Sequence, residues 1–493
     1  MKNTTANTYI ILLFVIYLSL NLYGKEAFNR NLLSYKKFQN LIKNKSLTLK
    51  INNLQAKKAE NNSLKLKAKE DLYLEGSYAN NKTKYYMSNP YYSEDYHEGY
   101  EISLSLKKKF VDYGTSISSE LNYSKYDFTG TGAILQKMDF TGKPVFIEQN
   151  FLYKHYMPHL SFSMQQPLWQ NYFGKLDKLE RLSAENKIEI AHLIQKQKNN
   201  DLLNFYHKLY FHWYLLDQKI SLVLKMVLNT RKIESESLSN YKSKLIDNSE
   251  YQKSKTNVLN YQEMKIVNEI EFKNLQQKLN AYIDLSQYRP DQKDFNNMYK
   301  QCINDKITPL LYYKTLRYQL IAKSEDDLQA EKLFNQVKLN PEFNVFANLV
   351  LKNDDSAFNN SMNLKDLDYS IGFICQKALE NTQVNAKIEE IELKIKENKY
   401  RQELLENEYL SNIYTLTEKI HHLKSRLTVK RDKLKSLNSI YNTEKKKFKQ
   451  AKINTISLLK AKNEILKEKI NIINLKTELI IYYLDFKNIS KKS

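Results

Sequence analysis

Apolar and polar residues alternate in several short stretches of this chain, and a period of two predicts strands with two different faces. In one of them Phe343, Val345 and Ala347 lie on one face of the expected strand. The four predicted strands cover about 71–80, 158–167, 342–352 and 367–377. The Tyr-rich segment 82–156 is long for one connection, so we expect it to form an extra hairpin and loop.

Long helical stretches flank these strands. Leu416, Ile420, Leu423 and Leu427 follow one another at steps of three and four, as in a coiled coil. Seven of the nine glycines lie between Gly76 and Gly174, and neither Gly nor Pro occurs in 175–289 or 373–493. Because these residues are the strongest breakers of regular structure, both segments can remain helical. We predict antiparallel helical hairpins over about 175–284 and 379–487.

The order of helix, strand pair and helix occurs twice, which indicates an internal repeat. Gln166 and Gln376 lie at the ends of equivalent strands, and Tyr241 and Phe448 lie near the ends of the long helices. The difference in residue number between Gln166 and Gln376 is almost the same as the difference between Tyr241 and Phe448, although the two pairs lie in different elements. We therefore predict a first structural repeat over 25–303 and a second over 304–493.

The N-terminus predicts a secretory signal peptide over 1–24. Lys2 precedes an apolar run from Tyr9 to Leu22, which is shorter than the about 20 residues that a membrane-spanning helix needs. No later segment is apolar enough to span a membrane as a helix, so membrane residence would require strands. Four strands cannot close a barrel, but three copies supply twelve. The sequence therefore predicts a homotrimer whose strands lie in the outer membrane and whose helices extend into the periplasm.

Composition excludes several other functions. The net charge of +22 would suit nucleic-acid binding, but the lysines are spread along helices without a groove-reading or stacking motif. Cys302 and Cys375 are too few for a disulfide framework and are interpreted as small apolar residues. No spacing typical of a metal site, a cofactor or a catalytic triad is present. We expect no enzymatic activity, no cofactor and no nucleic-acid partner.

Four features of the sequence belong together: the run from Ser161 to Leu168 (SFSMQQPL), the following Gly174, Pro341 directly before a strand, and the duplicated order of elements. These features resemble those of the TolC-like outer-membrane efflux proteins, the outer membrane factors. The resemblance implies a mainly α fold with β, in which long coiled-coil hairpins form a periplasmic helical barrel and four main strands per chain form a trimeric 12-stranded β-barrel. It further implies a passive exit duct of a tripartite efflux pump or type I secretion system. A periplasmic adaptor and an inner-membrane pump would be its partners, and 82–156 would lie on the extracellular side.

The resemblance also assigns roles to the helical tips. Residues at the positions that contact an adaptor are Tyr241, Lys244, Leu245, Phe448, Ala451 and Lys452. Family tips usually read aromatic-x-x-Gly, but Lys244 and Ala451 occupy the glycine positions here. Because Gly is favoured where φ is positive, we expect a different turn or a weaker adaptor fit. Tyr241 and Phe448 could equally be ordinary coiled-coil contacts.

By the same resemblance, acidic groups six residues beyond the tip glycine narrow the periplasmic entrance. Glu250 occupies this position in the first repeat, with Asp247 nearby, but Ser457 occupies it in the second. Half of the acidic pattern is therefore absent, which weakens the expectation of a cation-selective gate. Asp247 could instead stabilise the turn through its side chain, and Glu250 could be a solvated surface charge.

Two other classes of protein fit part of the pattern. One is a periplasmic coiled-coil adaptor, and the other is a structural or adhesin protein on a coiled-coil stalk. An adaptor would need compact β domains around a single hairpin. It would not need two separate strand pairs with apolar faces, which favours the channel.

Overall fold

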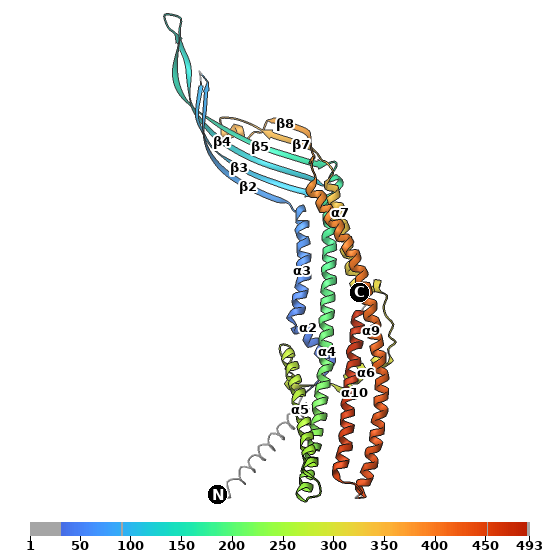
Figure 1. The fold of residues 1–493 in the computed structure, drawn as a ribbon. Helices are drawn as coiled ribbons and strands as arrows, with labels where there is room; N and C mark the ends of the chain where they lie inside the picture. The colour runs from blue at the N-terminus through green and yellow to red at the C-terminus, as the bar shows by residue number, and fades with distance from the viewer. Residues whose placement is uncertain (1–30, 90–91, 451, 491–493) are drawn as a thin grey trace, which may run out of the picture. The chain divides into compact units, whose positions relative to one another are not determined.

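The structure is a computed structural model that describes residues 31–89, 92–450 and 452–490 (Figure 1). The predicted signal peptide over 1–24 lies outside these residues. The helices are α2 (Tyr35–Lys45), α3 (Leu47–Lys67), α4 (Lys175–Lys242), α5 (Asn248–Leu279), α6 (Gln292–Asn304), α7 (Leu316–Lys338), α8 (Phe358–Ser361), α9 (Thr382–Lys449) and α10 (Thr455–Ile489). The strands are β1 (Asn31–Leu33), β2 (Tyr73–Asn89), β3 (Tyr92–Phe110), β4 (Thr115–Met138), β5 (Pro144–Pro167), β6 (Tyr288–Pro290), β7 (Glu342–Lys352) and β8 (Asp366–Gln376).

The chain divides into two compact units, each containing parts of both predicted repeats. The first comprises the described residues up to Gln55, Leu193–Leu320, and those from Gln402 onward. The second comprises Ala56–His192 and Ile321–Arg401. Among the described helices, none combines the length and the apolar character needed to cross a membrane.

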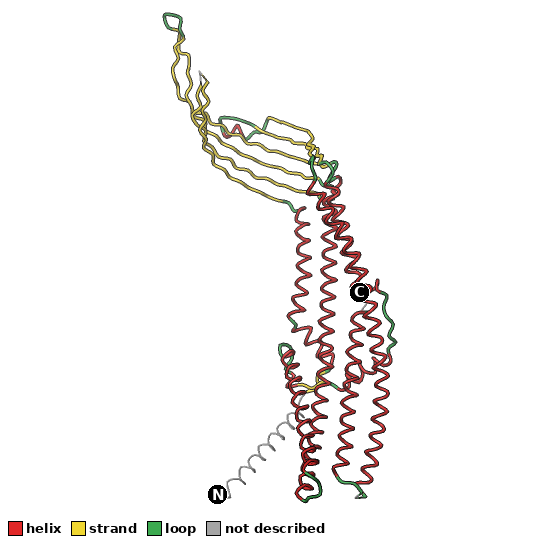
Figure 2. The backbone as a smooth tube through the Cα atoms, viewed as in Figure 1, coloured by secondary structure: helices red, strands yellow, loops and turns green. Residues whose placement is uncertain are grey.

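The second unit contains a six-stranded antiparallel sheet in the order β2-β3-β4-β5-β7-β8 (Figure 2). The predicted combination of long helices and an antiparallel sheet is confirmed, but the prediction of four main strands is wrong. β7 and β8 lie almost where they were expected, whereas β2 and β5 extend well beyond 71–80 and 158–167.

The segment 82–156 does contain an extra hairpin, formed by β3 and β4, but this hairpin is part of the main sheet, and its extracellular placement stays a prediction. This segment supplies β3 and β4, which pair with β2 and β5 from one end of those strands to beyond their middle. Tyr73 pairs with Lys107 and Lys107 with Ser118, so the new strands start level with their neighbours. The physical reason is that the alternation around 101–107 and 117–123 has the same two faces as β2 and β5, which favours pairing along the whole length.

Four helices of the second unit form one layer in the order α3, α4, α7 and α9. The strands connected to them, β2, β5, β7 and β8, follow one another in the same order in the sheet. Polar side-chain contacts join neighbouring helices: Glu60 lies 2.9 Å from His192, and ion pairs join Glu189 with Lys323 at 2.8 Å and Lys332 with Glu392 at 2.8 Å. Each helix therefore leads into the strand that lies at the matching position.

The first unit has its own aromatic and aliphatic core. The largest fully buried side chains there include Trp213, Tyr210, Phe211 and Phe295. The hydroxyl of Tyr210 donates to the Leu33 carbonyl at 2.9 Å, which fixes the short parallel pair of β1 and β6 beside α4. A buried tyrosine is stable there because its hydroxyl has a hydrogen-bond partner.

The two cysteines differ in their surroundings. Cys302 is buried in the core of the first unit, and burial raises the pKa of its thiol to about 12. The thiol therefore stays protonated and acts as a small apolar group, as predicted. Cys375 is exposed on β8.

The two long helices have equal length, since α4 and α9 each contain 68 residues. Their first residues, Lys175 and Thr382, have the same offset in numbering as Tyr241 and Phe448. The partner helices α5 and α10 begin at Asn248 and Thr455, which again have this offset. The constant offset supports an internal repeat, whereas the boundaries 25–303 and 304–493 stay a prediction.

Candidate channel wall and helical tips

One face of the six-stranded sheet is apolar and exposed. Leu104 on β3 is 46% exposed and Ile371 on β8 is 75% exposed. The strand register brings residues of the same kind together on this face: Leu74 with Leu106, Leu104 with Leu121, Ile117 with Met164, and Phe162 with Leu349. An apolar surface that covers all six strands is typical of a contact with lipid or with another protein.

The opposite face of the same sheet is polar and rich in serine. Its serines include Ser77, Ser103, Ser105, Ser116, Ser118, Ser124, Ser161, Ser163 and Ser370. Ser77 and Ser103 lie opposite each other with their hydroxyls 2.7 Å apart, and Asn122 donates to Glu101. One face suited to lipid and one suited to water is the pattern expected of a channel wall.

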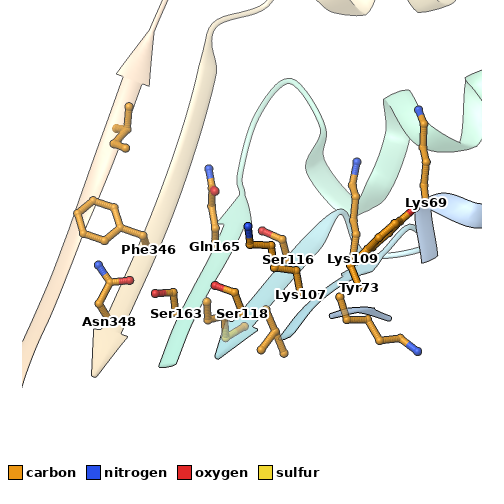
Figure 3. Close-up of a pocket in the computed structure, with 14 residues that line it drawn as sticks. Lys69, Tyr73, Lys107, Lys109, Ser116, Ser118, Ser163, Gln165, Phe346 and Asn348 are labelled. Atoms are coloured by element: carbon orange, nitrogen blue, oxygen red, sulfur yellow. The ribbon is translucent and has the colours of Figure 1, made fainter. Parts of the chain in front are cut away.

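A hollow of about 600 Å³ lies where strand ends on the polar face meet the helices (Figure 3). Its lining includes four lysines, serine, glutamine and asparagine side chains, and the apolar Ile117, Met164, Phe346 and Ile374. Three of the lysines have a carboxylate partner: Lys69 with Glu180 at 2.5 Å, Lys107 with Glu75 at 2.7 Å, and Lys109 with Asp177 at 2.8 Å. The hollow therefore has a mixed polar and apolar lining, and three of its four positive charges are paired.

The sheet ends in two edges that have no partner strand among the described residues of the chain. β2 forms one edge and β8 the other, and they run in opposite directions because the sheet has an even number of antiparallel strands. Unpaired edges expose rows of backbone N–H and C=O groups that readily pair with another strand. β8 of one copy can therefore pair antiparallel with β2 of the next.

The first helical tip connects α4 to α5 through a left-handed residue. Lys244 has φ +56°, the N–H of Leu245 donates to the Asn240 carbonyl at 2.8 Å, and the N–H of Lys244 donates to the Tyr241 carbonyl at 2.9 Å. This is a Schellman motif, which usually has Gly at the left-handed position. Lys244 therefore adopts the conformation that favours glycine. Of the two expectations, the structure does not contain a different turn at this residue, and the weaker adaptor fit stays a prediction.

Asp247 caps the helix that follows this turn. Its carboxylate accepts a hydrogen bond from the N–H of Glu250 at 2.7 Å, and the rings of Tyr241 and Tyr251 stack 5.7 Å apart. Capping removes one unsatisfied donor at the start of α5. The structure therefore contains the turn-stabilising role that was one alternative for Asp247. The roles of Asp247 and Glu250 at a periplasmic entrance stay a prediction.

The second tip repeats this hydrogen-bond pattern at the equivalent positions. The N–H of Lys452 donates to the Lys447 carbonyl at 2.9 Å, and Asn454 accepts from the N–H of Ser457 at 3.0 Å. Ala451 lies outside the described residues. Ser457 thus occupies the position of Glu250, but without a charge.

Three apolar side chains of the tips are available for contacts. Tyr241 is 40% exposed, Leu245 is 72% exposed and Phe448 is 38% exposed. The aromatic residues occupy equivalent positions in the two tips. Their exposure is compatible with the predicted adaptor contacts, which stay a prediction.

Comparisons with known proteins identify the fold. No protein-family model matches the sequence, and no curated protein is similar to it in sequence. The chain is similar to the solved structure of CusC, described through its transmembrane channel formation, with 9% identity and a TM-score of 0.64 over 93% of this chain and 92% of CusC. The chain has the fold of the TolC-like outer-membrane channels. The resemblance predicted from the sequence motifs is thereby confirmed at the level of fold.

Two further TolC-like structures cover almost the same part of the chain. The outer membrane protein VceC of Vibrio cholerae is 9% identical, with a TM-score of 0.61 over 93% of this chain and 96% of VceC. The outer membrane channel CmeC of Campylobacter jejuni is 10% identical, with a TM-score of 0.61 over 92% of this chain and 84% of CmeC.

The sequence did not indicate how the β3–β4 turn is anchored. Gly174 has φ +67°, and a Cβ atom on it would lie 1.9 Å from the Val111 carbonyl oxygen in that turn. Gly114 has φ +71°, and a Cβ atom on it would lie 2.8 Å from the Asn171 carbonyl oxygen. The only available signal was the position of these glycines at the predicted breaks.

Within the described residues, no cluster of His, Cys, Asp or Glu could hold a metal ion.

Proposed function

We propose that this protein is an outer-membrane exit duct of the efflux or type I secretion kind. Three copies would close their sheets into one wall in the outer membrane, and the helices would project into the periplasm. Cargo would pass passively through the tube. With six strands per chain, the proposed trimeric wall has 18 strands rather than the 12 expected from the sequence.

One observation carries this proposal: the six-stranded sheet has an apolar exposed face, a polar face and two free edges that can pair with further copies. Backbone groups in lipid must all be paired, so such a sheet is stable in a membrane only when it closes. The TolC-like fold supports the same conclusion, since CmeC is described as an outer membrane channel.

The helical tips are the proposed site of gating and of partner binding. Tyr241, Leu245 and Phe448 would contact a periplasmic adaptor, which in turn would join the duct to an inner-membrane pump. Glu250 from each copy would line the entrance, with Asp247 holding the start of α5 and Ser457 leaving the second tip uncharged. A ring of side-chain charges at a constriction controls which ions pass.

Membrane fractionation tests the basic proposal. We expect the mature protein in the outer membrane as a trimer that requires detergent for extraction, and we expect it to form conducting pores in planar bilayers. A soluble periplasmic monomer would favour the adaptor, and a surface-exposed protein without conductance would favour the adhesin stalk. Either result contradicts the channel.

Substitution of Glu250 tests the entrance separately. Glu250→Ala should reduce the preference for cations, and Ser457→Glu should increase it, because the fixed negative charge at the tips changes in opposite directions. Glu263, an exposed residue farther along α5, provides the matched control, so Glu263→Ala should leave selectivity unchanged. If all three variants conduct like the wild type, the entrance lies elsewhere.

A further inference from the structure

We propose that the β3–β4 hairpin widens the membrane section of the duct beyond the width that four strands per chain would give. The membrane section would then admit larger hydrophilic cargo than a wall of four strands per chain. This inference rests on the proposed function, and it adds the size and chemical class of the cargo.

The hairpin is a structural part of the wall and not a surface decoration. Its turn lies against the start of α4, where Gly174 leaves no room for a side chain next to Val111. At the ends of the two strands, Lys109 forms an ion pair with Asp177 of α4 at 2.8 Å, and Thr115 donates to Gln166 of β5. Asp177 is buried, so the ion pair belongs to the junction between the hairpin and the helix.

The hairpin also keeps the two faces of the sheet continuous. Tyr73, Lys107, Ser118 and Ser163 lie side by side across β2, β3, β4 and β5. Tyr73 and Ser163 are therefore on the same face whether or not β3 and β4 lie between them. β3 and β4 therefore lie between β2 and β5 without exchanging the apolar and polar faces. A shift of the pairing by one residue would exchange them.

The strand spacing sets the width that each chain adds to the wall. Strands lie about 4.8 Å apart, so at a barrel tilt of about 40° each occupies about 6 Å of circumference. Six strands then span about 38 Å and four span about 25 Å. A trimeric wall with six strands per chain is therefore about one and a half times as wide as a wall with four.

The chemistry of the polar face defines the cargo. Serines line much of this face, and three of the four lysines that line the hollow are paired with Glu75, Asp177 and Glu180. Small hydroxyl groups and paired charges hold a solute of either sign weakly. A wide wall of this kind suits large hydrophilic molecules, as in 16–18-stranded porins, which leave an aqueous channel.

Deletion of the hairpin tests the proposal in the full-length protein. Residues 90–148 are replaced by Asn-Gly, so that β2 leads directly into β5 through a two-residue turn. Because the faces remain matched, we expect a trimer with 12 strands. The diameter of the largest polyethylene glycol that enters the pore from the side of the sheet should fall by about one third, since barrel diameter grows roughly linearly with strand number.

A shorter deletion in the same segment controls for changes that leave the number of strands intact. β4 and β5 continue beyond the last pair between β3 and β4, Tyr92 with Gly132. Replacing residues 134–147 by Asn-Gly shortens this projection but keeps all six strands. This variant should admit the same polymers as the wild type, because the number of strands in the wall is unchanged.

The possible results separate the two proposals. A smaller size limit in the 90–148 deletion alone supports the wide duct, and equal limits in all three proteins overturn it. If the 90–148 deletion fails to assemble, the size limit of the wild-type pore is the deciding measurement. The proposal is supported if the wild type admits polymers too wide for a 12-stranded wall. It is overturned if the wild type admits only polymers that fit such a wall. A wild type that forms neither trimers nor pores refutes the proposed function itself.

Discussion

Replacement of Lys244 by glycine should stabilise the first helical tip. Lys244 has φ +56°, a conformation that costs a residue with a side chain about 1–2 kcal/mol and costs glycine almost nothing. Glycine also increases the entropy of the unfolded chain, which offsets about 0.5–1 kcal/mol of the gain. We therefore expect a net gain of about 0.5–1 kcal/mol in the free energy of opening the tip.

Hydrogen exchange measures this effect directly. The N–H groups of Lys244 and Leu245 close the turn, so they exchange only when the tip opens. Because 1.4 kcal/mol corresponds to a factor of ten, Lys244→Gly should slow their exchange by about twofold to fivefold. The effect should be confined to the tip and absent from the core of the first unit.

Two variants separate conformation from charge. Lys244→Ala removes the charge but keeps a side chain at positive φ, so exchange should change little. Lys242→Gly places glycine at the last residue of α4, where it weakens the helix by up to about 1 kcal/mol and should accelerate exchange. If Lys244→Ala slows exchange as much as Lys244→Gly, repulsion between lysines and not backbone strain limits the tip, and the reasoning is refuted.

Three further predictions concern the wall and the core. Leu104→Lys should reduce the yield of assembled protein in the membrane, because a lysine facing lipid at mid-depth costs about 2–4 kcal/mol, whereas Ser103→Lys on the opposite face should assemble normally. Gly174→Ala should lower the midpoint of thermal unfolding more than Gly142→Ala does, because both have positive φ but only the former lacks room for a Cβ atom. Burial lowers the pKa of His212 below 6.5, so stability should fall as the pH drops from 6.5 through the lower folded pKa, and His212→Gln should flatten this dependence in unfolding curves at different pH.

Local patterns predicted most of the fold because they depend on neighbouring residues. The absence of Gly and Pro from 175–289 indicated the first long hairpin, and the alternation from Phe343 to Leu351 placed β7 at its observed bounds. The number of strands in the sheet could not be predicted in the same way. It depends on which distant strand each segment pairs with, and the alternation within 82–156 is compatible with an outer hairpin as well as with the main sheet.

The candidate site was predictable only in part for a related reason. The constant offset between the two halves of the chain brought the two tips into register, and the equivalent hydrogen bonds at Leu245 and Lys452 follow from it. The rule that Gly favours positive φ, however, did not predict that Lys244 itself would adopt the left-handed conformation. The Schellman hydrogen bonds and the cap at Asp247 stabilise the turn enough to hold a lysine in that conformation.

Addition of a hairpin is the smallest change that can widen this wall. One extra strand between β2 and β5 would reverse the direction of every later strand relative to β2, so that β5 could no longer lead into α4 at the same end of the sheet. Two extra strands restore the direction, keep β2 and β8 antiparallel at the edges, and leave closure by identical copies possible. Tyr73 and Ser163 also remain on one face. An inserted hairpin with this register therefore preserves the strand direction, the antiparallel edges and the two faces of the sheet together. Width can therefore change only in steps of two strands per chain, and β3 and β4 are one such step.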